Sequence, residues 1–503
     1  MINSQLVAFV LYFVLIIGVG IFFFIKTKNG NEKDYFLGGR SMGPWVTAMS
    51  AQASDMSGWL LMGFPGSILA FGMGKVWIGI GLALGTALNW IFVAKRLRQF
   101  SAAANDSITI PQYLKNRFLE EGKALQIICA VIFLVCFTAY VASSFLAGAA
   151  VFTKVLPSVP QSTALVIFAL IIVLYTFLGG FKAVCWTDFF QGLMMLIALL
   201  AVPILIVKSE DFLASNITKE YLMSDGTMSV FNSNPFASNW TDIVSGLGWG
   251  LGYFGMPHII VRFMSAKDSK TIKKSAVIGI VWVVLSLGAA IVIAILGRAL
   301  YAEELLKNGL QERIFIRCTE LFPPFIGGLL LSAVIAAAMS TADSQLLVAS
   351  SSFTSDIYKP VIRKKASDKE ALWIGRIVVL IIAVVAYFIA SSKSEAASGI
   401  MNLVENAWGG FGASFGPVII LTLFWKRLTY KGAIAGVVCG ALTDIMWLIC
   451  VNNADNGFYL YEIVPGFIVG CLAAVIVTLI DKEPRKEVYD LYDRAVSDSF
   501  EQQ

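Results

Sequence analysis

The sequence predicts an all-α polytopic membrane protein with about thirteen transmembrane helices. Of its 503 residues, 57% are hydrophobic and only 14% are charged, whereas soluble domains carry about 25% charged residues. The mean hydropathy is +0.76. Apolar runs of about twenty residues, the length that crosses a bilayer as a helix, recur from end to end. The net charge of +5 is modest and gives no reason to expect a nucleic-acid partner.

Each predicted span is an apolar run between polar or charged loops. The spans are 5–26, 43–72, 76–94, 124–155, 163–180, 187–208, 239–262, 276–299, 324–352, 371–391, 398–425, 432–451 and 459–480. Lysine and arginine gather in alternate loops, as at 26–40, 95–123, 262–274, 359–369 and 426–431. By the positive-inside rule, the N-terminus lies outside and the C-terminus inside. Residues 1–480 therefore form a single transmembrane domain, and 481–503 form a charged cytoplasmic tail.

A carboxylate lies in the middle of the second span. Asp55 stands between Ala53-Ser54 and Met56-Ser57-Gly58, with apolar sequence on both sides. A charge at mid-membrane depth costs about 3 kcal/mol or more unless it is compensated. Gly58 and Pro65 allow the helix to break and to turn carbonyl oxygens toward an ion. The pattern therefore indicates a cation site.

The seventh span also has the composition of a broken helix. Glycines recur every two or three residues from Gly246 to Gly255, and Pro257 follows. Trp249 and Tyr253 lie one helical turn apart, which favours a pocket face. Spans 2 and 7 run in opposite directions, as expected of two inverted five-helix repeats, 43–208 and 239–425. The alternative for span 7 is close helix packing by small residues.

The ninth span places two hydroxyl side chains beside small residues. Ser340 and Thr341 follow an alanine-rich run that includes Ala337. Sodium is a hard cation that neutral oxygens satisfy, so hydroxyls and carbonyls suffice to bind it. The alternative is a serine- and threonine-rich packing seam.

These motifs resemble those of the sodium:solute symporter family, and within it the sodium/proline branch. The resemblance covers essentially the whole chain. It rests on the segments 34–41, 53–63, 179–181, 186–188, 248–255, 257–259, 262–264, 339–341 and 345–348. It implies the LeuT-type fold of inverted five-helix repeats with flanking helices.

The resemblance also implies site residues. Sodium is expected at the backbone oxygens of Ala53, Met56 and Ala337 and the hydroxyls of Ser340 and Thr341. Asp55 is expected to be required for sodium coupling, either as a ligand or by holding the break through hydrogen bonds. An apolar, aromatic wall suits the pyrrolidine ring of L-proline. The residues expected near it are Ser57, Gly58, Trp59, Tyr140, Trp249, Tyr253 and Pro257.

Three further positions carry open alternatives. Some family members build a second sodium site from an aspartate at the Asp188 position and hydroxyls on span 9. Here Ser344 is present, but Asp343 stands where a hydroxyl is expected, so Asp188 could instead anchor a cytoplasmic gate. Arg40 either sets the orientation of span 2 or forms a gate ion pair. Met256 stands where proline-transporting members tend to carry glutamine.

Two other acidic residues lie within predicted spans. Glu405 and Asp444 are each costly enough in a membrane to need a partner or water. We expect structural pairing, or a position near an interface, for both.

The resemblance therefore implies a sodium-coupled symporter of the cell membrane that imports L-proline, with Na⁺ as the co-transported ion, no organic cofactor and a functional monomer. One alternative is a sodium symporter for another small solute, such as a different zwitterion, pantothenate or a sugar acid. A second is an ion channel. A third is a membrane-embedded sensor, which is disfavoured because no signalling domain is evident. An enzyme is disfavoured, because the chain has one histidine and no nucleophile and base set.

Overall fold

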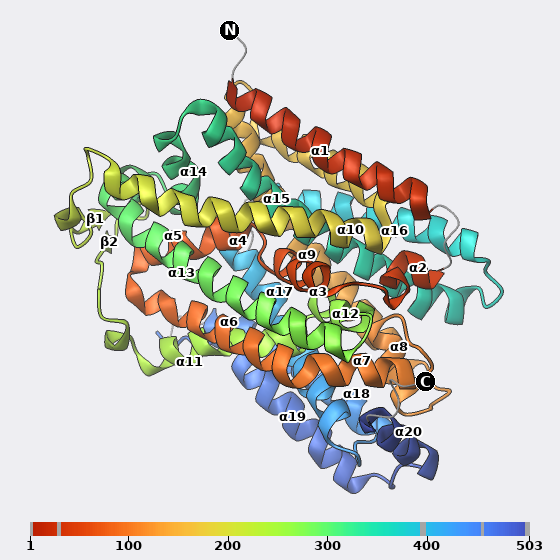
Figure 1. Ribbon diagram of the computed structural model, residues 1–503. Coiled ribbons are helices and arrows are strands. Elements are labelled where there is room, and N and C mark those ends of the chain that lie inside the picture. The colour runs from red at the N-terminus through yellow and green to blue at the C-terminus, as the bar shows by residue number, and fades with distance from the viewer. Residues whose placement is uncertain (1–3, 28–31, 393–398, 454–456, 498–503) are drawn as a thin grey trace.

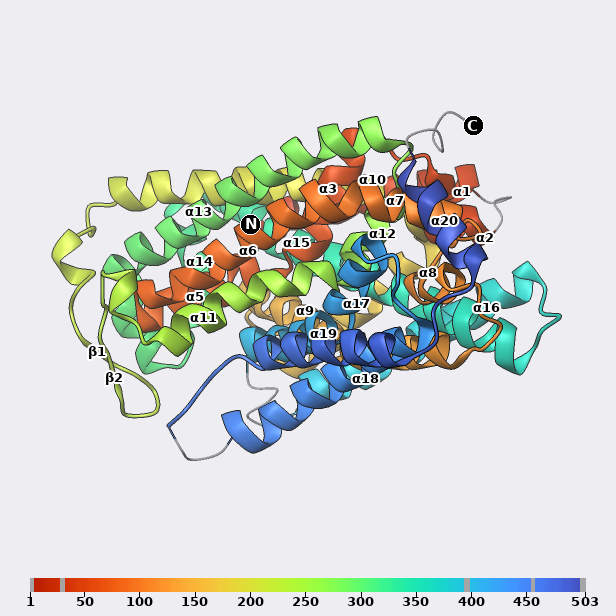
Figure 2. The same ribbon diagram turned by 90° about the horizontal axis from the view of Figure 1, so that it is seen from below.

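The computed structural model describes residues 4–27, 32–392, 399–453 and 457–497. The remaining residues lie outside this description: 1–3, 28–31, 393–398, 454–456 and 498–503. They fall at the N-terminus, in predicted loops, at the start of the predicted span 398–425 and in the predicted tail. The described chain folds into a bundle of long helices that share one general direction (Figures 1 and 2).

The helices are α1 Ser4–Thr27, α2 Glu32–Leu37, α3 Pro44–Asp55, α4 Gly58–Leu61, α5 Gly63–Phe71, α6 Val76–Leu88, α7 Ala94–Ala103, α8 Ile110–Arg117, α9 Ala124–Val155, α10 Gln161–Lys208, α11 Trp240–Gly248, α12 Pro257–Ser265, α13 Ser269–Lys307, α14 Ile314–Cys318, α15 Pro324–Ser352, α16 Asp368–Ala390, α17 Ile400–Phe424, α18 Tyr430–Trp447, α19 Ile463–Ile480 and α20 Lys486–Val496. Short 3₁₀ or π segments join them: η1 Gly38–Arg40, η2 Met73–Lys75, η3 Asn89–Val93, η4 Ala214–Asn216, η5 Pro235–Ala237, η6 Trp249–Phe254, η7 Gln311–Arg313, η8 Thr319–Leu321, η9 Phe353–Ile362 and η11 Leu448–Asn452. The strands are β1 Tyr221–Leu222 and β2 Met228–Ser229.

The predicted spans coincide with helical structure. Within the described residues, 10 helices are long and apolar enough to cross a membrane. Span 163–180 is a shorter apolar helix, Gln161–Phe177, joined to the next span within α10 at Gly180, whose φ of 62° leaves the helical region. Spans 43–72 and 239–262 are each interrupted. The polytopic all-α prediction is confirmed, apart from the antiparallel pair β1–β2 in the loop 209–238.

The two ends of the bundle differ. The β1–β2 hairpin, in a loop predicted to lie outside, is at one end, whereas α8 and α20, predicted to lie inside, are at the other (Figures 1 and 2). Apolar side chains on the periphery are exposed, such as Val14 at 64% and Leu15 at 62% on α1. A bilayer covers such a surface without cost.

The centre of the bundle is α15. Of the candidate spans in the described chain, the one that contains α15 is the most buried, at 83%. It packs against α1, α9 and α10, and it also contacts α3. The hydroxyls of Ser340 and Thr341 are therefore held in the interior, where a polar group needs a partner.

The second span is broken where the sequence predicts it. Helix α3 ends at Asp55, and Met56 (φ −82°, ψ 66°) and Ser57 (φ −59°, ψ −166°) leave the helical conformation. The Ser57 side chain then accepts a hydrogen bond from the Trp59 N–H and caps α4. The break thus turns Ala53 and Asp55 into the end of a half-helix inside the bundle.

The seventh span is broken as well, and its glycines also permit close packing. Helix α11 passes into the 3₁₀ segment η6, and Pro257 opens α12 after the extended residue Met256. A methyl group at Gly250 would lie 2.3 Å from the Gly81 carbonyl oxygen of α6. The interrupted helix and the small-residue seam are therefore properties of the same segment.

Gly252→Ala should destabilise the protein. Its methyl group would lie 1.9 Å from Nε1 of Trp408, which donates to the Trp249 carbonyl oxygen at 2.8 Å. Overpacking of this kind costs about 1–3 kcal/mol, so thermal unfolding in detergent should begin at a lower temperature. Gly18→Ala is the control, because a methyl group there meets nothing within 4 Å. Equal unfolding temperatures for the two variants would contradict the packing described.

Candidate ion and substrate site

The predicted sodium ligands of span 9 meet the end of the broken span 2. Ser340 Oγ donates to the Ala53 carbonyl oxygen at 2.8 Å and lies 3.1 Å from the Ala337 carbonyl oxygen. Thr341 Oγ1 lies 3.5 Å from the same Ala53 oxygen. The structure thus brings Ala53, Ala337, Ser340 and Thr341 together, all completely buried. Met56 forms part of the adjacent break.

The chemistry of this junction suits a hard monovalent cation. Its oxygens are carbonyls and hydroxyls, which bind sodium without carrying a charge. The hydroxyl hydrogens of Ser340 and Thr341 point toward the Ala53 carbonyl oxygen. If a cation bound between the same oxygens, these hydrogens would turn away, and the cation would become the positive partner of the Ala53 carbonyl.

Asp55 links the two broken helices. Its Oδ2 accepts a hydrogen bond of 2.5 Å from the hydroxyl of Tyr253 in η6. The residue is only 1% exposed, and its Oδ1 has no hydrogen-bond partner among the described residues. The carboxyl is therefore tied to span 7 by one oxygen and keeps the other available at the break. Within the described residues, its carboxylate makes no hydrogen bond to Ser340 or Thr341.

The aromatic residues predicted for the substrate gather beside this carboxyl. The rings of Trp59 and Trp249 are 6.3 Å apart, and Tyr253 lies one helical turn from Trp249. The Tyr140 hydroxyl lies beside Ser57 and Trp59, although it has no hydrogen bond of normal geometry within the described chain. The rings of Trp59 and Trp249 thus form an apolar surface in the interior of the bundle.

Gly58 and Pro257 have local roles that the structure makes clear. A methyl group at Gly58 would lie 2.5 Å from Cβ of Ala147, so this glycine allows α4 to approach α9 closely. Pro257 occupies the first position of α12, where its missing N–H costs nothing. Both residues shape the backbone around the aromatic wall.

Sequence reasoning missed three members of this cluster. Trp408 of α17 stacks on Trp249 with a centroid distance of 6.3 Å, and the ring of Tyr461 also packs on Trp249, at 5.2 Å. Asn89 Nδ2 donates to the Tyr253 carbonyl oxygen at 2.9 Å. The sole signal for Trp408 is its position before Gly409-Gly410, which a packing seam explains equally well.

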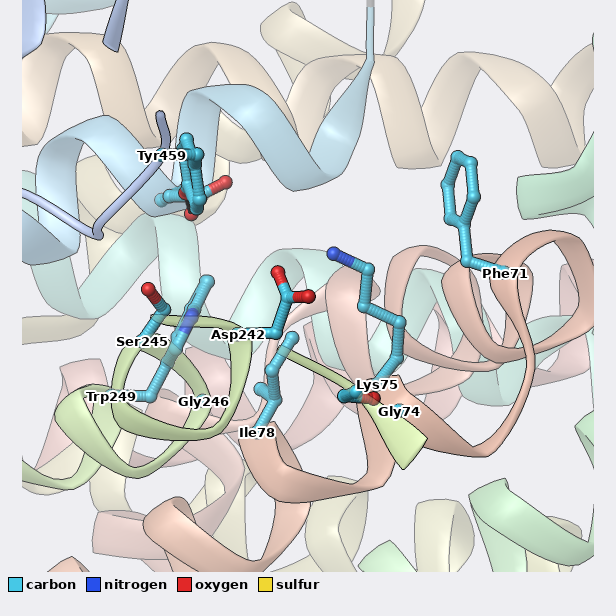
Figure 3. A pocket seen from close by; sticks show the side chains of 11 residues that line it. Phe71, Gly74, Lys75, Ile78, Asp242, Ser245, Gly246, Trp249 and Tyr459 are labelled. Atoms are coloured by element: carbon cyan, nitrogen blue, oxygen red, sulfur yellow. Dashed lines mark hydrogen bonds between the residues drawn. The ribbon is translucent and has the colours of Figure 1, made fainter. Parts of the chain in front are cut away.

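A cavity of about 270 Å³ opens toward this cluster from the predicted outer side (Figure 3). Lys75 and Asp242 extend into it, and Tyr459 lies across from them (Figure 3). Trp249 also lines the cavity while remaining only 2% exposed. Trp249 therefore separates the cavity from the interior site.

On the inner side, Asp188 belongs to a buried ion pair. Its Oδ2 lies 3.2 Å from Arg262 Nη2 and accepts hydrogen bonds from Ser50 at 2.7 Å and Ser54 at 3.0 Å. Arg262 also donates to Ser344. The structure thus places Asp188 and Ser344 on the same guanidinium group, that of Arg262. The cation that this carboxylate contacts in the structure is the guanidinium group.

Arg40 forms a second ion pair nearby. It lies 8% exposed at the start of span 2, and its Nε is 2.8 Å from Asp106 Oδ1. Its Nη1 donates to the Met264 carbonyl oxygen at 2.5 Å, and its Nη2 to the Ser107 carbonyl oxygen at 2.9 Å. Arg40 therefore joins span 2 to α12 and to the loop after α7, which supports the gate alternative over a mere orientation signal.

This architecture is that of the LeuT-type secondary transporters, whose interrupted helices surround a site at mid-membrane. A Na⁺-coupled sialic acid symporter, solved in a substrate-bound outward-open state, superimposes with a TM-score of 0.77 at 19% identity, covering 96% of this chain and 99% of that one. Mhp1, a nucleobase-cation-symport-1 family transporter in a closed conformation, gives 0.57 at 16% identity, with 94% and 98% covered. These likenesses establish the fold.

The sequence comparisons establish the family. The model of the sodium:solute symporter family matches residues 35–440, and the chain belongs to this family. It is thus a multi-pass membrane transporter and not an enzyme. The high-affinity proline transporter PutP of Bacillus subtilis is 43% identical over 94% of this chain and 97% of its own length. The sodium/proline symporters of Haemophilus influenzae and Escherichia coli are each 42% identical, over 98% and 96% of this chain and 98% and 94% of theirs.

Asp106→Asn should weaken the inner network in a pH-dependent way. Although burial opposes ionisation, the hydrogen bond from Lys33 and the charge of Arg40 hold the Asp106 pKa below its usual value. The ion pair therefore stabilises the fold above the usual aspartate pKa of about 4 and loses its effect as the pH falls through the lowered pKa. The variant should melt earlier at neutral pH, and the difference from wild type should shrink on acidification.

The check is thermal unfolding over a pH series, with the exposed Glu210 changed to Gln as the control. A difference between Asp106→Asn and wild type that stays constant down to acidic pH would contradict the ion-pair account.

Proposed function

We propose that this protein is a sodium-coupled symporter that imports L-proline by alternating access. The observation that carries the proposal is the meeting of the Ser340 and Thr341 hydroxyls with the Ala53 carbonyl at the break in span 2. The relatives named as proline transporters support the substrate. Inward movement of one charge across 100 mV supplies about 2.3 kcal/mol, enough to drive accumulation.

In this proposal, sodium binds at Ala53, Met56, Ala337, Ser340 and Thr341. Its positive charge draws the end of α3 toward α15 and stabilises the broken conformation. Asp55 acts as a coupling residue through its hydrogen bond to Tyr253, which places η6 and its aromatic rings. Sodium binding therefore orders the wall that receives the substrate.

L-Proline lies against Trp59, Tyr140, Trp249 and Tyr253, with Ser57, Gly58 and Pro257 shaping the backbone around it. The rings contact the pyrrolidine ring, while the free N–H and C=O groups at the helix breaks are directed at the ammonium and carboxylate groups. Met256, which is buried and apolar, cannot contribute a side-chain hydrogen bond.

The inverted repeats are taken as 43–208 and 239–425, and the protein as a functional monomer of the cell membrane. Arg40 and the Asp188–Arg262–Ser344 network hold the inner side closed while the outer cavity is open. Inward release requires these pairs to separate. The arginine beside Asp188 favours a gate over a second sodium site at this position.

Proline uptake into proteoliposomes tests the proposal. An inward sodium gradient should drive accumulation above equilibrium, whereas an equal potassium gradient or a proton gradient alone should not. Ser340→Ala removes one ligand worth about 1–2 kcal/mol, so half-maximal uptake should require about tenfold more sodium.

The matched control is Ser332→Ala on the same helix, because within the described residues its buried hydroxyl bonds to the Gly328 carbonyl of its own helix and to no other group. Uptake of another zwitterion, of pantothenate or of a sugar acid in place of proline would overturn the substrate. Ion flux without any solute and without a constant ratio would indicate a channel instead.

Tyr253→Phe should uncouple Asp55 from span 7. Loss of this one hydroxyl leaves a buried carboxyl oxygen without its donor, at a cost of about 1–3 kcal/mol, so the sodium concentration for half-maximal uptake should rise. Tyr113→Phe is the control, since it deletes an equally buried hydroxyl that donates to Thr422 at 3.0 Å, away from the site. A normal sodium dependence in Tyr253→Phe would rule out coupling through this bond.

A further inference from the structure

Two buried carboxyls that the site does not use meet in the outer half of the bundle. Asp444 lies on α18, and Glu462 immediately precedes α19. They are 4% and 1% exposed. A methyl group on Gly409 of α17 would lie 2.9 Å from Asp444 Oδ1 and 3.4 Å from Glu462 Oε1. The two oxygens therefore both lie against the backbone of Gly409.

Among the described residues, neither of these oxygens has a hydrogen-bond partner. Asp444 Oδ1 and Glu462 Oε1 make no hydrogen bond within the described part of the chain. Glu462 Oε2 accepts from Asn452 Nδ2 at 2.9 Å. Glu405, by contrast, accepts a hydrogen bond from the Tyr459 hydroxyl.

The surroundings of the pair are acidic or neutral. From α17, Glu405 adds a second negative charge that acts on Glu462. From α9, Cys136 approaches Asp444, since a methyl group on Gly410 would touch both side chains. From the segment before α19, Tyr459 and Tyr461 face the same carboxyls. Among the described residues, the cation that acts on this group is Lys75, which reaches Glu405 across the outer cavity.

Two adjacent carboxylates without a cation are unstable in an apolar interior. Burial penalises each charge, and the like charges repel each other. One bound proton removes the repulsion and one of the two buried charges, and a protonated carboxyl can donate its O–H to the remaining carboxylate if the two oxygens come within hydrogen-bond distance. This is the arrangement that arises when two carboxyls share a site too small for two charges.

We propose that Asp444 and Glu462 form a proton-binding carboxyl pair that holds one shared proton at neutral pH. The proton comes from water in the outer cavity, which Glu405 and Tyr459 both line, and it returns there when the pair ionises. The bound state carries one negative charge and the ionised state two.

The pair is positioned to affect the aromatic wall. Tyr461 is adjacent to Glu462 in the chain, its hydroxyl donates to the Glu405 carbonyl oxygen at 2.8 Å, and its ring packs on Trp249 at 5.2 Å. Loss of the shared proton would push α18 and Glu462 apart and move Tyr461. External alkalinity would therefore loosen the packing behind Trp249.

Infrared spectroscopy of the purified protein tests the proposal without any transport assay. The spectrum of wild type minus Asp444→Asn/Glu462→Gln should contain the C=O band of a protonated carboxyl at pH 7. That band should disappear when the pH is raised by roughly two to three units. In Glu405→Gln the band should persist, because Glu405 is not a member of the pair.

A second control is Glu320→Gln, since Glu320 is ion-paired with Lys154 and Arg317 and should contribute no such band. Absence of the band at pH 7, or its loss in Glu405→Gln, would overturn the proposal. If the double variant does not fold, Asp444→Asn alone is measured. This single variant should shift the pH midpoint of the protonated-carboxyl band by about one unit or more. An unchanged midpoint would also contradict the proposal.

Discussion

The structure depends on one backbone interruption, at Asp55–Gly58, and on the hydroxyls that cover it. A helix broken inside a membrane protein leaves carbonyl and N–H groups without partners, and such groups are tolerated only where protein or an ion satisfies them. Ser340 satisfies the Ala53 carbonyl from α15, and Tyr253 satisfies Asp55 from η6. Three elements far apart in the sequence are thereby held at one point.

The polar groups on either side of this point are distributed unequally. Toward the predicted inner side, Arg40 and Arg262 are buried and bonded to several helices at once. Toward the outer side, a cavity reaches Trp249. Separating only one partner of a buried ion pair leaves an uncompensated charge. The inner side therefore opens only when both the Arg40–Asp106 and the Arg262–Asp188 pairs separate. The transporter fold and this asymmetry together give alternating access a physical basis.

Much of this was predictable because the signals are local. A carboxylate in an apolar run, a proline after closely spaced glycines, and adjacent hydroxyls beside alanines each identify a break or a ligand from a few neighbouring residues. The two interruptions and the hydroxyls of Ser340 and Thr341 are predictable in this way, whereas Ala53 and Tyr140 were expected only from the family resemblance.

The remainder depends on tertiary contacts that leave no local trace. Trp408 stands 159 positions from the Trp249 carbonyl that it binds, and nothing in its own surroundings names that partner. Arg262 was predictable as an inner-loop cation but not as the partner of Asp188. Asp444 was recognised as costly, yet its neighbour Glu462 lies at the end of another span, and only the packing around Gly409 shows that they meet.

In the proposed mechanism, sodium binds between α3 and α15 before any substrate. Equilibrium binding of radioactive sodium to the purified protein, without proline, tests it most directly. Wild type and Ser332→Ala should show saturable binding, and Ser340→Ala/Thr341→Ala should lose it. Saturable binding of unchanged affinity in the double variant would place the ion elsewhere and contradict the account.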